Sequence, residues 1–149
     1  MASDSCRVLI EETKWHGSGL KKYYTYEHTY IGSLTLQEMD GTPWVYAKKE
    51  DAATPIALDA EIRPDGFILR EKGSQRTVTR SGDWLVLKET DNEDDTVLQW
   101  WKSDIGMGYH AKFKSGGSWV CTSGSGELNV KNSGDKAVFW HDGFFSIPV

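Results

Sequence analysis

The stretch TVTRSGDWL, residues 77–85, contains the pattern that decides the fold. A short run of alternating residues enters a glycine turn, and the next run opens with Trp84 followed by Leu85. Only Val78 is strongly apolar in the first run, so its side chain is expected to point into the core. The stretch therefore predicts a β-hairpin with one buried face.

The same pattern occurs twice more in the chain. One copy is LTLQEMDGTPWV, residues 34–45, and the other is AKFKSGGSWV, residues 111–120. A unit of this size cannot bury its apolar face alone, so three such units are expected to pack about one axis and share a core. Because Trp44, Trp84 and Trp119 occupy the same place in the three copies, we expect their indoles to lie in that core.

The rest of the chain has the rhythm of an all-β protein. No window of ordinary helix length has apolar residues at helical spacing. Short runs rich in Val, Ile, Tyr, Phe, Trp and Thr instead end at turn residues about every seven to ten positions. Leu128 and Val130 alternate with polar residues, so their side chains are expected to lie on one face of a strand and the polar side chains on the other. The length of 149 residues and the lack of a long linker indicate a single all-β domain over residues 1–149.

Three units of about 40 residues, each with about four short strands, resemble the β-trefoil. Gln99-Trp100-Trp101 is similar to the Gln-x-Trp signature of ricin-B-like trefoil lectins. The form Gly-x-Trp-Val followed by a glycine-rich turn is similar to the units of fascin-like trefoils. The resemblance covers residues 33–149 and implies three four-strand units. An up-and-down β-barrel resembling the lipocalin or avidin group is the second expectation, and a β-sandwich is the third.

Charge and hydropathy exclude two classes of function. The chain has 17 Lys and Arg against 22 Asp and Glu, a net charge of −5, so we expect no nucleic-acid partner. No segment approaches the run of about 18 apolar residues that a membrane helix needs, so no membrane span is expected. Residues 1–7 lack the apolar stretch of a signal peptide, which predicts a cytoplasmic protein or one exported without a cleaved signal.

The sequence carries none of the common motifs for catalysis or metal binding. Its four histidines form no HxH, HxxxH or HExxH pattern, so neither a metal nor a cofactor is expected. The acidic run 91–95 offers oxygen ligands of the kind calcium prefers, but a solvated loop is favoured. No Gly-x-Ser-x-Gly motif occurs, and we expect no enzymatic activity. Cys6 and Cys121 are expected to be reduced thiols, with a disulfide as the alternative.

Aromatic residues are the most suggestive functional feature, at 12% of the chain with seven Trp. The candidate ligand-binding residues are Tyr24, Tyr26, His28, Trp100, Trp101 and Asp104. Alternation places the first three on one strand face, which could stack on sugar rings or belong to an aromatic core. The adjacent Trp100 and Trp101 should point to opposite faces, and the outward indole near Asp104 is a candidate sugar platform.

These observations predict a lectin-like module that binds glycans or glycoproteins through aromatic stacking and polar contacts. A protein-interaction module, such as a protease inhibitor or a fascin-like cytoskeletal binder, is the second hypothesis. It would use the loops at residues 50–55 and 103–108. A β-barrel that carries a small apolar ligand is the third, and it requires an apolar internal cavity.

Overall fold

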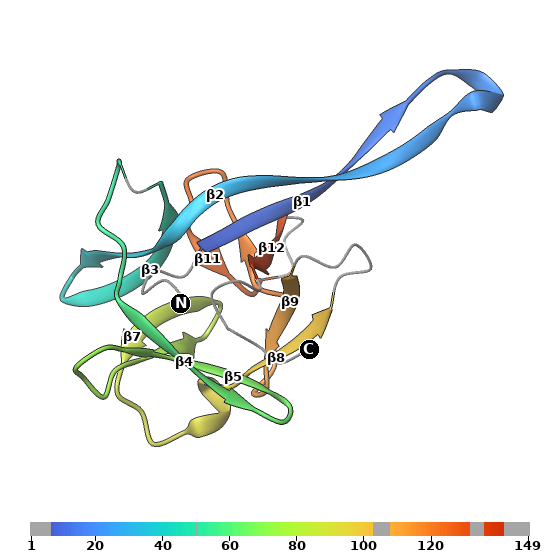
Figure 1. The fold of residues 1–149 in the computed structure, drawn as a ribbon. Helices are drawn as coiled ribbons and strands as arrows, with labels where there is room; N and C mark the ends of the chain where they lie inside the picture. Colours follow the sequence, from blue (N-terminus) through green and yellow to red (C-terminus); the bar gives the residue numbers. More distant parts are fainter. Residues whose placement is uncertain (1–6, 50, 103–107, 132–135, 142–149) are drawn as a thin grey trace.

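The protein is built almost entirely of antiparallel β-strands (Figure 1). The computed structural model describes residues 7–49, 51–102, 108–131 and 136–141, and in this part the helices are two short 3-10 turns, η1 (Gly19–Lys21) and η2 (Glu93–Asp95). The strands of this part are β1 (Arg7–His16), β2 (Tyr23–Met39), β3 (Thr42–Lys48), β4 (Leu58–Arg63), β5 (Gly66–Glu71), β6 (Thr77–Ser81), β7 (Trp84–Lys88), β8 (Leu98–Lys102), β9 (Gly108–Phe113), β10 (Cys121–Thr122), β11 (Leu128–Asn129) and β12 (Lys136–His141). The all-β prediction is confirmed.

Three hairpins, β2–β3, β6–β7 and β10–β11, meet pairwise through their second strands. The three contacts pair Trp44 with Val86, Trp84 with Asn129, and Glu127 with Tyr46. Trp44, Trp84 and Glu127 are equivalent positions, and each pairs with the residue two places after the equivalent position of another hairpin. The arrangement therefore has approximate threefold symmetry. Two backbone hydrogen bonds repeat in the same way, from Ala47 to Gly126 and from Val130 to Asp83, each 2.8 Å long.

This register corrects the third copy of the sequence repeat. Trp44 and Trp84 occupy equivalent positions, as predicted, but the equivalent position in the third hairpin is Glu127 rather than Trp119. Trp119 lies before β10, which places it one strand earlier in its own unit. The tryptophan that follows a glycine turn therefore lies in the second strand of the hairpin in two units. In the third unit it precedes the first strand.

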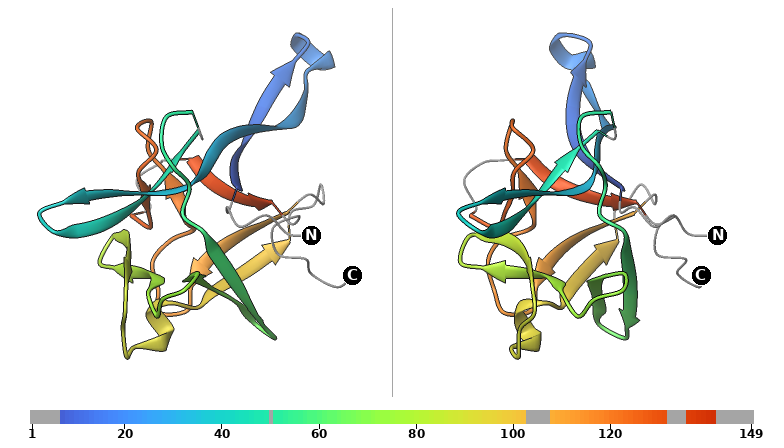
Figure 2. Two further views of the ribbon diagram at one scale, coloured as in Figure 1. Left: turned by 60° about the vertical axis from the view of Figure 1, so that its left-hand side comes forward. Right: turned by 90° about the vertical axis from the view of Figure 1, so that its left-hand side faces the viewer.

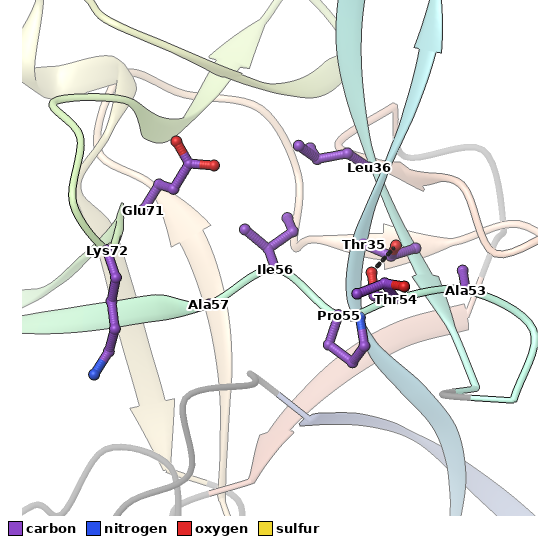
Figure 3. A pocket seen from close by; sticks show the side chains of 9 residues that line it. All are labelled: Thr35, Leu36, Ala53, Thr54, Pro55, Ile56, Ala57, Glu71 and Lys72. Carbon is purple, nitrogen blue, oxygen red and sulfur yellow. Dashed lines mark hydrogen bonds between the residues drawn. The ribbon is translucent and has the colours of Figure 1, made fainter.

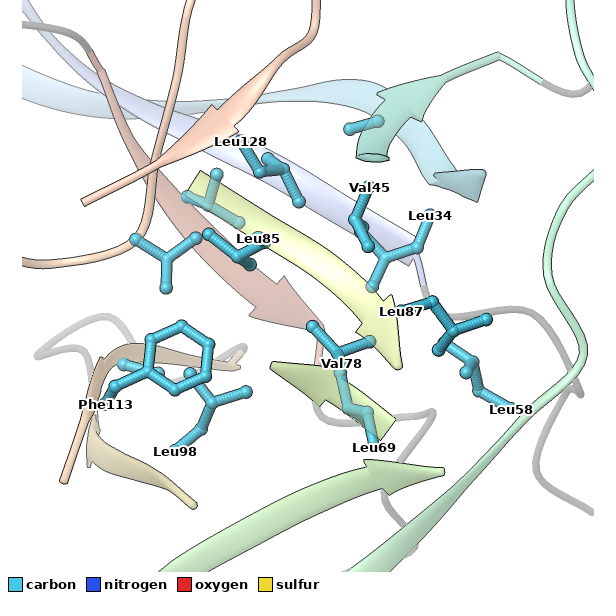
Figure 4. Close-up of a cluster of buried hydrophobic side chains, with 14 of the residues drawn as sticks. Leu34, Val45, Leu58, Leu69, Val78, Leu85, Leu87, Leu98, Phe113 and Leu128 are labelled. Atoms are coloured by element: carbon cyan, nitrogen blue, oxygen red, sulfur yellow. The ribbon is translucent and has the colours of Figure 1, made fainter. Parts of the chain in front are cut away.

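The core draws equally on the three hairpins (Figure 4). The first hairpin strands, with the residue just before β10, contribute Leu34, Val78 and Val120, and the second strands contribute Val45, Leu85 and Leu128. Val78, Leu128 and Val130 are buried, which confirms the alternation predicted for them. Burial of one such side chain stabilises the fold by about 1.5–3 kcal/mol.

The prediction that the repeat tryptophans form the core is wrong. Trp44, Trp84 and Trp119 are each half-buried, and none of them belongs to the central cluster. In a strand, neighbouring side chains point to opposite faces. The residue after each tryptophan is fully buried, so the indole itself is held at the surface of the sheet.

The chain order of the strands also excludes the second expected fold. An up-and-down barrel pairs each strand with the next one in the chain. Here β7 lies between β3 and β11, and β12 lies between β10 and β9. The described strands do not close into a barrel, and they form one hydrogen-bonded network instead of the two separate sheets of a sandwich.

Strands β1 and β2 form a long hairpin that projects from the body (Figures 1 and 2). The base of β1 pairs with β12, where Val8 lies opposite Trp140 and Ile10 opposite Val138. The pairing of β1 with β2 continues outward to His16 opposite Tyr23. The first 32 residues, which the repeat pattern leaves unassigned, therefore include both arms of this projecting hairpin.

A hydrogen bond between two of the hairpins leads to a pH-dependent prediction. The Tyr46 hydroxyl donates to Glu127 Oε2 over 3.2 Å. Burial, followed by the negative charge of Glu127 and this hydrogen bond, raises the pKa of Tyr46 above its ordinary value near 10. The folded state thus binds the phenol proton more tightly than the unfolded state does.

We expect Tyr46→Phe to lower the free energy of unfolding by about 1 kcal/mol at neutral pH, because the hydrogen bond is lost. The stability due to the raised pKa is fully present below pH ~10 and is lost as the pH rises through the folded pKa. The variant should therefore lose less stability than the unmodified protein above pH ~10. Urea unfolding at neutral and alkaline pH measures both effects, and parallel alkaline losses in the two proteins would contradict the assignment.

Candidate functional site

The side chains of Trp100 and Trp101, which are adjacent in β8, point to opposite faces, as alternation predicts. The Trp100 ring packs on Phe67 with centroids 5.1 Å apart, at the edge of the core. Trp101 is 49% exposed on the other face. The structure therefore leaves Trp101 at the surface as a candidate contact for a ligand and gives Trp100 a packing role.

The Trp101 side chain belongs to a surface cluster that we call the Trp101–Trp119 patch, made of Trp101, His110, Lys112 and Trp119. Trp101 lies directly opposite His110 in the β8–β9 pairing, and Lys112 is two residues further along the same strand face. The hydrogen bond from the Val120 amide to the Ala111 carbonyl, 2.9 Å long, brings the segment that carries Trp119 against β9. Residues from three consecutive segments thus meet at one place.

The two indoles of the patch stand nearly perpendicular to each other. Their centroids are 4.9 Å apart with planes at 89°, and the His110 ring lies 5.9 Å from Trp119 at 61°. Edge-to-face contacts of this kind are favoured by the charge distribution of aromatic rings. Each ring limits the motion of its neighbour, which holds the exposed Trp101 face in a fixed direction.

Lys112 places a positive charge against these rings. Its Nζ lies 4.5 Å from the centroid of Trp119 and 5.7 Å from that of Trp101, both within cation–π range. Within the described part of the chain, no carboxylate forms an ion pair with Lys112. The Nδ1 atom of His110 lies 3.3 Å from the Val138 carbonyl oxygen, and since a carbonyl can only accept, Nδ1 carries the proton of this contact.

The other predicted site residues do not join the patch. Tyr24 lies on the projecting hairpin, which points away from β8 and β9 in all views (Figures 1 and 2). Tyr26 and His28 have their backbone in β2, but their side chains lie outside the described residues, and so does Asp104. Sequence reasoning thus found one member of the patch, Trp101.

Three members of the patch were missed. The alternation of His110 and Lys112 around the fully buried Ala111 is the sequence signal that could have placed both on the outer face of β9. Trp119 had no such signal, because its position depends on how the segment before β10 folds back. The apparent repeat also assigned it to the core.

A second cluster of the same composition lies on the hairpin contacts. The Trp44 and Trp84 centroids are 6.4 Å apart with planes at 90°, and Lys131 Nζ lies 4.4 Å from the Trp84 centroid. This cluster and the Trp101–Trp119 patch therefore share two perpendicular indoles with a lysine over one of them. Its indoles are both half-buried, so neither of them is as exposed as Trp101.

A surface pocket of about 400 Å³ lies between β2, the segment before β4 and the end of β5 (Figure 3). Its polar groups already have partners: the Thr35 hydroxyl donates to the Thr54 carbonyl over 2.6 Å, and Lys72 pairs with Asp59 at 3.3 Å. The Glu71 carboxylate accepts hydrogen bonds from Arg76 at 2.8 and 2.9 Å. The pocket contains no candidate acid, base or nucleophile. It lies at the surface, whereas a carrier of a small apolar ligand needs a cavity inside the core.

Other candidate chemistry is equally limited. Among the described residues no three His, Cys, Asp or Glu side chains gather to hold a metal ion. In the acidic run, Glu93 pairs with Arg63 and Asp94 lies 3.8 Å from Lys114. His16 Nε2 lies 2.7 Å from the Thr25 hydroxyl, but on an exposed hairpin this pair lacks the enclosed surroundings of a catalytic dyad. Cys121 is a buried thiol, whereas Cys6 lies outside the described residues.

No family model matches the chain, and no curated protein is significantly similar to it. Among solved structures, the crystal structure of the lysenin pore is similar to it, with a TM-score of 0.54 and 8% sequence identity over 85% of this chain. The alignment covers 54% of the lysenin chain. At this identity the likeness shows the fold alone. None of the helices in the described residues is long and apolar enough to cross a membrane.

Proposed function

We propose that this chain is a non-enzymatic carbohydrate-binding module of β-trefoil type, with the Trp101–Trp119 patch as its binding site. The observation that carries the proposal is the exposed indole of Trp101, fixed perpendicular to Trp119 and beside Lys112. The flat apolar face of a sugar ring stacks on such an indole. The ammonium of Lys112 and the ring of His110 supply polar atoms for the sugar hydroxyls.

The β-trefoil assignment is supported by the arrangement of the three hairpins. They contact one another pairwise at equivalent positions, and each contributes the same two buried positions to the core. A fold does not by itself specify a function, so the carbohydrate proposal depends on the patch.

The open shape of the patch predicts weak binding at a single site. A sugar on Trp101 would keep much of its surface in water, unlike a ligand enclosed in a cleft. The Trp44–Trp84 cluster with Lys131 offers a second place of the same composition. Two weak sites on one rigid body would favour glycoproteins or surfaces that present several glycans at once, because the second contact is then intramolecular.

The proposal is tested by binding to a broad glycan array, followed by titration calorimetry with the best glycan. Trp101→Ala is expected to weaken binding about tenfold or more, because the stacking surface is removed. The indole is half-exposed and lies outside the core, so the urea midpoint of the variant should stay close to that of the unmodified protein.

The matched control is Trp15→Ala, which removes an exposed indole of the projecting hairpin; Trp15 is 60% exposed, against 49% for Trp101. This variant should bind the glycan as the unmodified protein does. A blank array, or equal losses in the two variants, would contradict the proposal. A blank array would favour a protein partner, since exposed tryptophans are also common anchors of protein interfaces.

A further inference from the structure

We propose that the tip of the β1–β2 hairpin, residues 15–24, is a docking surface for anionic phospholipid bilayers. The first observation is the exposure of its apolar side chains. Trp15 is 60% exposed, Tyr23 59% and Tyr24 51%, and Leu20 is fully exposed. These are four of the seven most exposed large apolar side chains among the described residues. Soluble proteins rarely gather apolar groups in this way without a binding role.

The apolar groups surround the tip instead of covering one face. Trp15 packs edge-on against Tyr24, with centroids 5.4 Å apart, on one face of the hairpin. His16 stacks on Tyr23 at 5.1 Å on the other face. Leu20 projects from the connecting turn. A folded protein partner would cover one face of such a hairpin, whereas the interfacial region of a bilayer surrounds all of it.

The tip stands clear of the rest of the molecule. The three views of Figures 1 and 2 show the hairpin extending beyond the body, so no other described element lies between its tip and a flat surface. Tryptophan and tyrosine are the residues that favour the boundary between lipid and water, because each has an apolar ring with a polar atom. The tip therefore has the shape and composition of an interfacial anchor.

Charge identifies the kind of bilayer. Residues 13–26 contain Lys14, Lys21 and Lys22 and no acidic residue, although the whole chain has a net charge of −5. The Nζ atom of Lys22 lies over the Trp15 ring, 5.0 Å from its centroid, so a positive charge accompanies the exposed indole at the tip. Each lysine near an anionic membrane surface strengthens binding, which favours bilayers rich in phosphatidylserine.

The position of the acidic residues limits the depth of docking. Glu12 and Glu27 lie opposite each other in the hairpin, three residues below the pair formed by Trp15 and Tyr24. At about 3.3 Å per residue, these two backbone positions lie about 10 Å from those of Trp15 and Tyr24. Acidic residues at these positions disfavour deeper entry into an anionic bilayer, so the tip would enter to the shallow depth that is usual for interfacial anchors.

Local contacts keep the tip ordered without help from the body. The His16 ring accepts or donates a 2.7 Å hydrogen bond with the Thr25 hydroxyl across the two strands. The Lys21 amide donates to the Ser18 carbonyl over 3.2 Å and closes the turn. Because the backbone of the strands is paired up to His16 and Tyr23, shallow docking leaves few backbone groups without partners.

The test is co-sedimentation of the full chain with sucrose-loaded vesicles. One set contains phosphatidylcholine alone, and the other contains equal amounts of phosphatidylcholine and phosphatidylserine. The protein should bind the second set more tightly, and added salt should weaken that binding because it screens the lysines. Neither set contains a glycan, so failure here and failure of the carbohydrate proposal are separate results.

Two variants of the tip give distinct expectations. Leu20→Ser should weaken binding to phosphatidylserine vesicles about tenfold, because one apolar side chain no longer enters the interface. The double variant Lys21→Gln, Lys22→Gln should weaken it about tenfold as well and should lose most of the preference for the phosphatidylserine set, since Lys14 alone remains. Leu20 is fully exposed, so its replacement leaves the folded structure intact.

Trp101→Ala is the matched control and should bind vesicles as the unmodified protein does. Lack of sedimentation with phosphatidylserine vesicles at low salt would overturn the proposal. Unchanged binding by Leu20→Ser would also overturn it. A third overturning result is self-association of the unmodified protein in analytical ultracentrifugation that Leu20→Ser abolishes, because the tip would then be an interface between two copies of the chain.

Discussion

Phe67→Ala is expected to lower the free energy of unfolding by about 4 kcal/mol, the largest effect of any single substitution considered for this protein. Phe67 is completely buried and lies at the junction of two strand pairs, opposite Ile62 in β4 and opposite Leu98 in β8. Its removal loses the transfer energy of a phenyl ring and leaves a cavity that the surrounding strands cannot fill without breaking their pairing. Urea unfolding followed by circular dichroism measures the change.

Ile62→Ala is the matched control for this prediction. Ile62 pairs with Phe67 across β4 and β5, but it is 40% exposed, so its truncation should change stability by about 0.5 kcal/mol or less. Similar losses in the two variants would show that Phe67 is not the central packing residue. If Phe67→Ala does not fold, Phe67→Leu should still lose about 1 kcal/mol, because it conserves most of the volume.

Substitution of Phe67 is also expected to affect the candidate site. The Trp100 ring packs on Phe67, and Trp101 follows it in β8. A cavity at Phe67 would release Trp100 and allow β8 to shift, which would disturb the angle between Trp101 and Trp119. We expect glycan binding by Phe67→Leu to weaken even though the substituted side chain touches no ligand.

The fold class could be predicted from the sequence because alternation and turn residues are local signals. The Asp40-Gly41 turn illustrates this: both residues have positive φ, 54° and 77°, as a two-residue hairpin turn requires. The repeat could be predicted for the first two units only. In the third unit, the segment that carries Trp119 resembles the second strand of the other hairpins. The pairings of Glu127 with Tyr46 and of Asn129 with Trp84, which join segments distant in the chain, show the true register.

The candidate site was less predictable, since it depends on contacts between segments that are distant in the chain. Alternation alone could show that Trp100 and Trp101 face opposite ways, but not which of them faces outward. The length of the projecting β1–β2 hairpin could not be predicted from the sequence either. The glycines at 17 and 19 are typical of a loop, so local signals alone do not show how far the two strands extend toward the turn. The pairing continues to His16 and Tyr23 because cross-strand aromatic contacts stabilise it.

Gly32→Ala is expected to lower the free energy of unfolding by about 3 kcal/mol, from backbone strain together with a steric clash. Gly32 has a φ of 132° and lies where β2 leaves its pairing with β1 and begins to pair with β3. A Cβ atom at this position would lie 2.2 Å from the carbonyl carbon and oxygen of Lys48, which are backbone atoms that cannot rotate away. The β2–β3 hairpin must shift to relieve the contact.

Gly41→Ala separates the two causes of this loss. Gly41 lies in the turn between β2 and β3 with a φ of 77°, but a Cβ atom there would meet no heavy atom within 4 Å. Its replacement should cost only the strain of a positive φ, about 1 kcal/mol. Urea unfolding of the two variants measures the difference between them. Equal losses would contradict the steric argument, whereas a larger loss in Gly32→Ala would show that the close approach of β2 to Lys48 fixes where the projecting hairpin leaves the body.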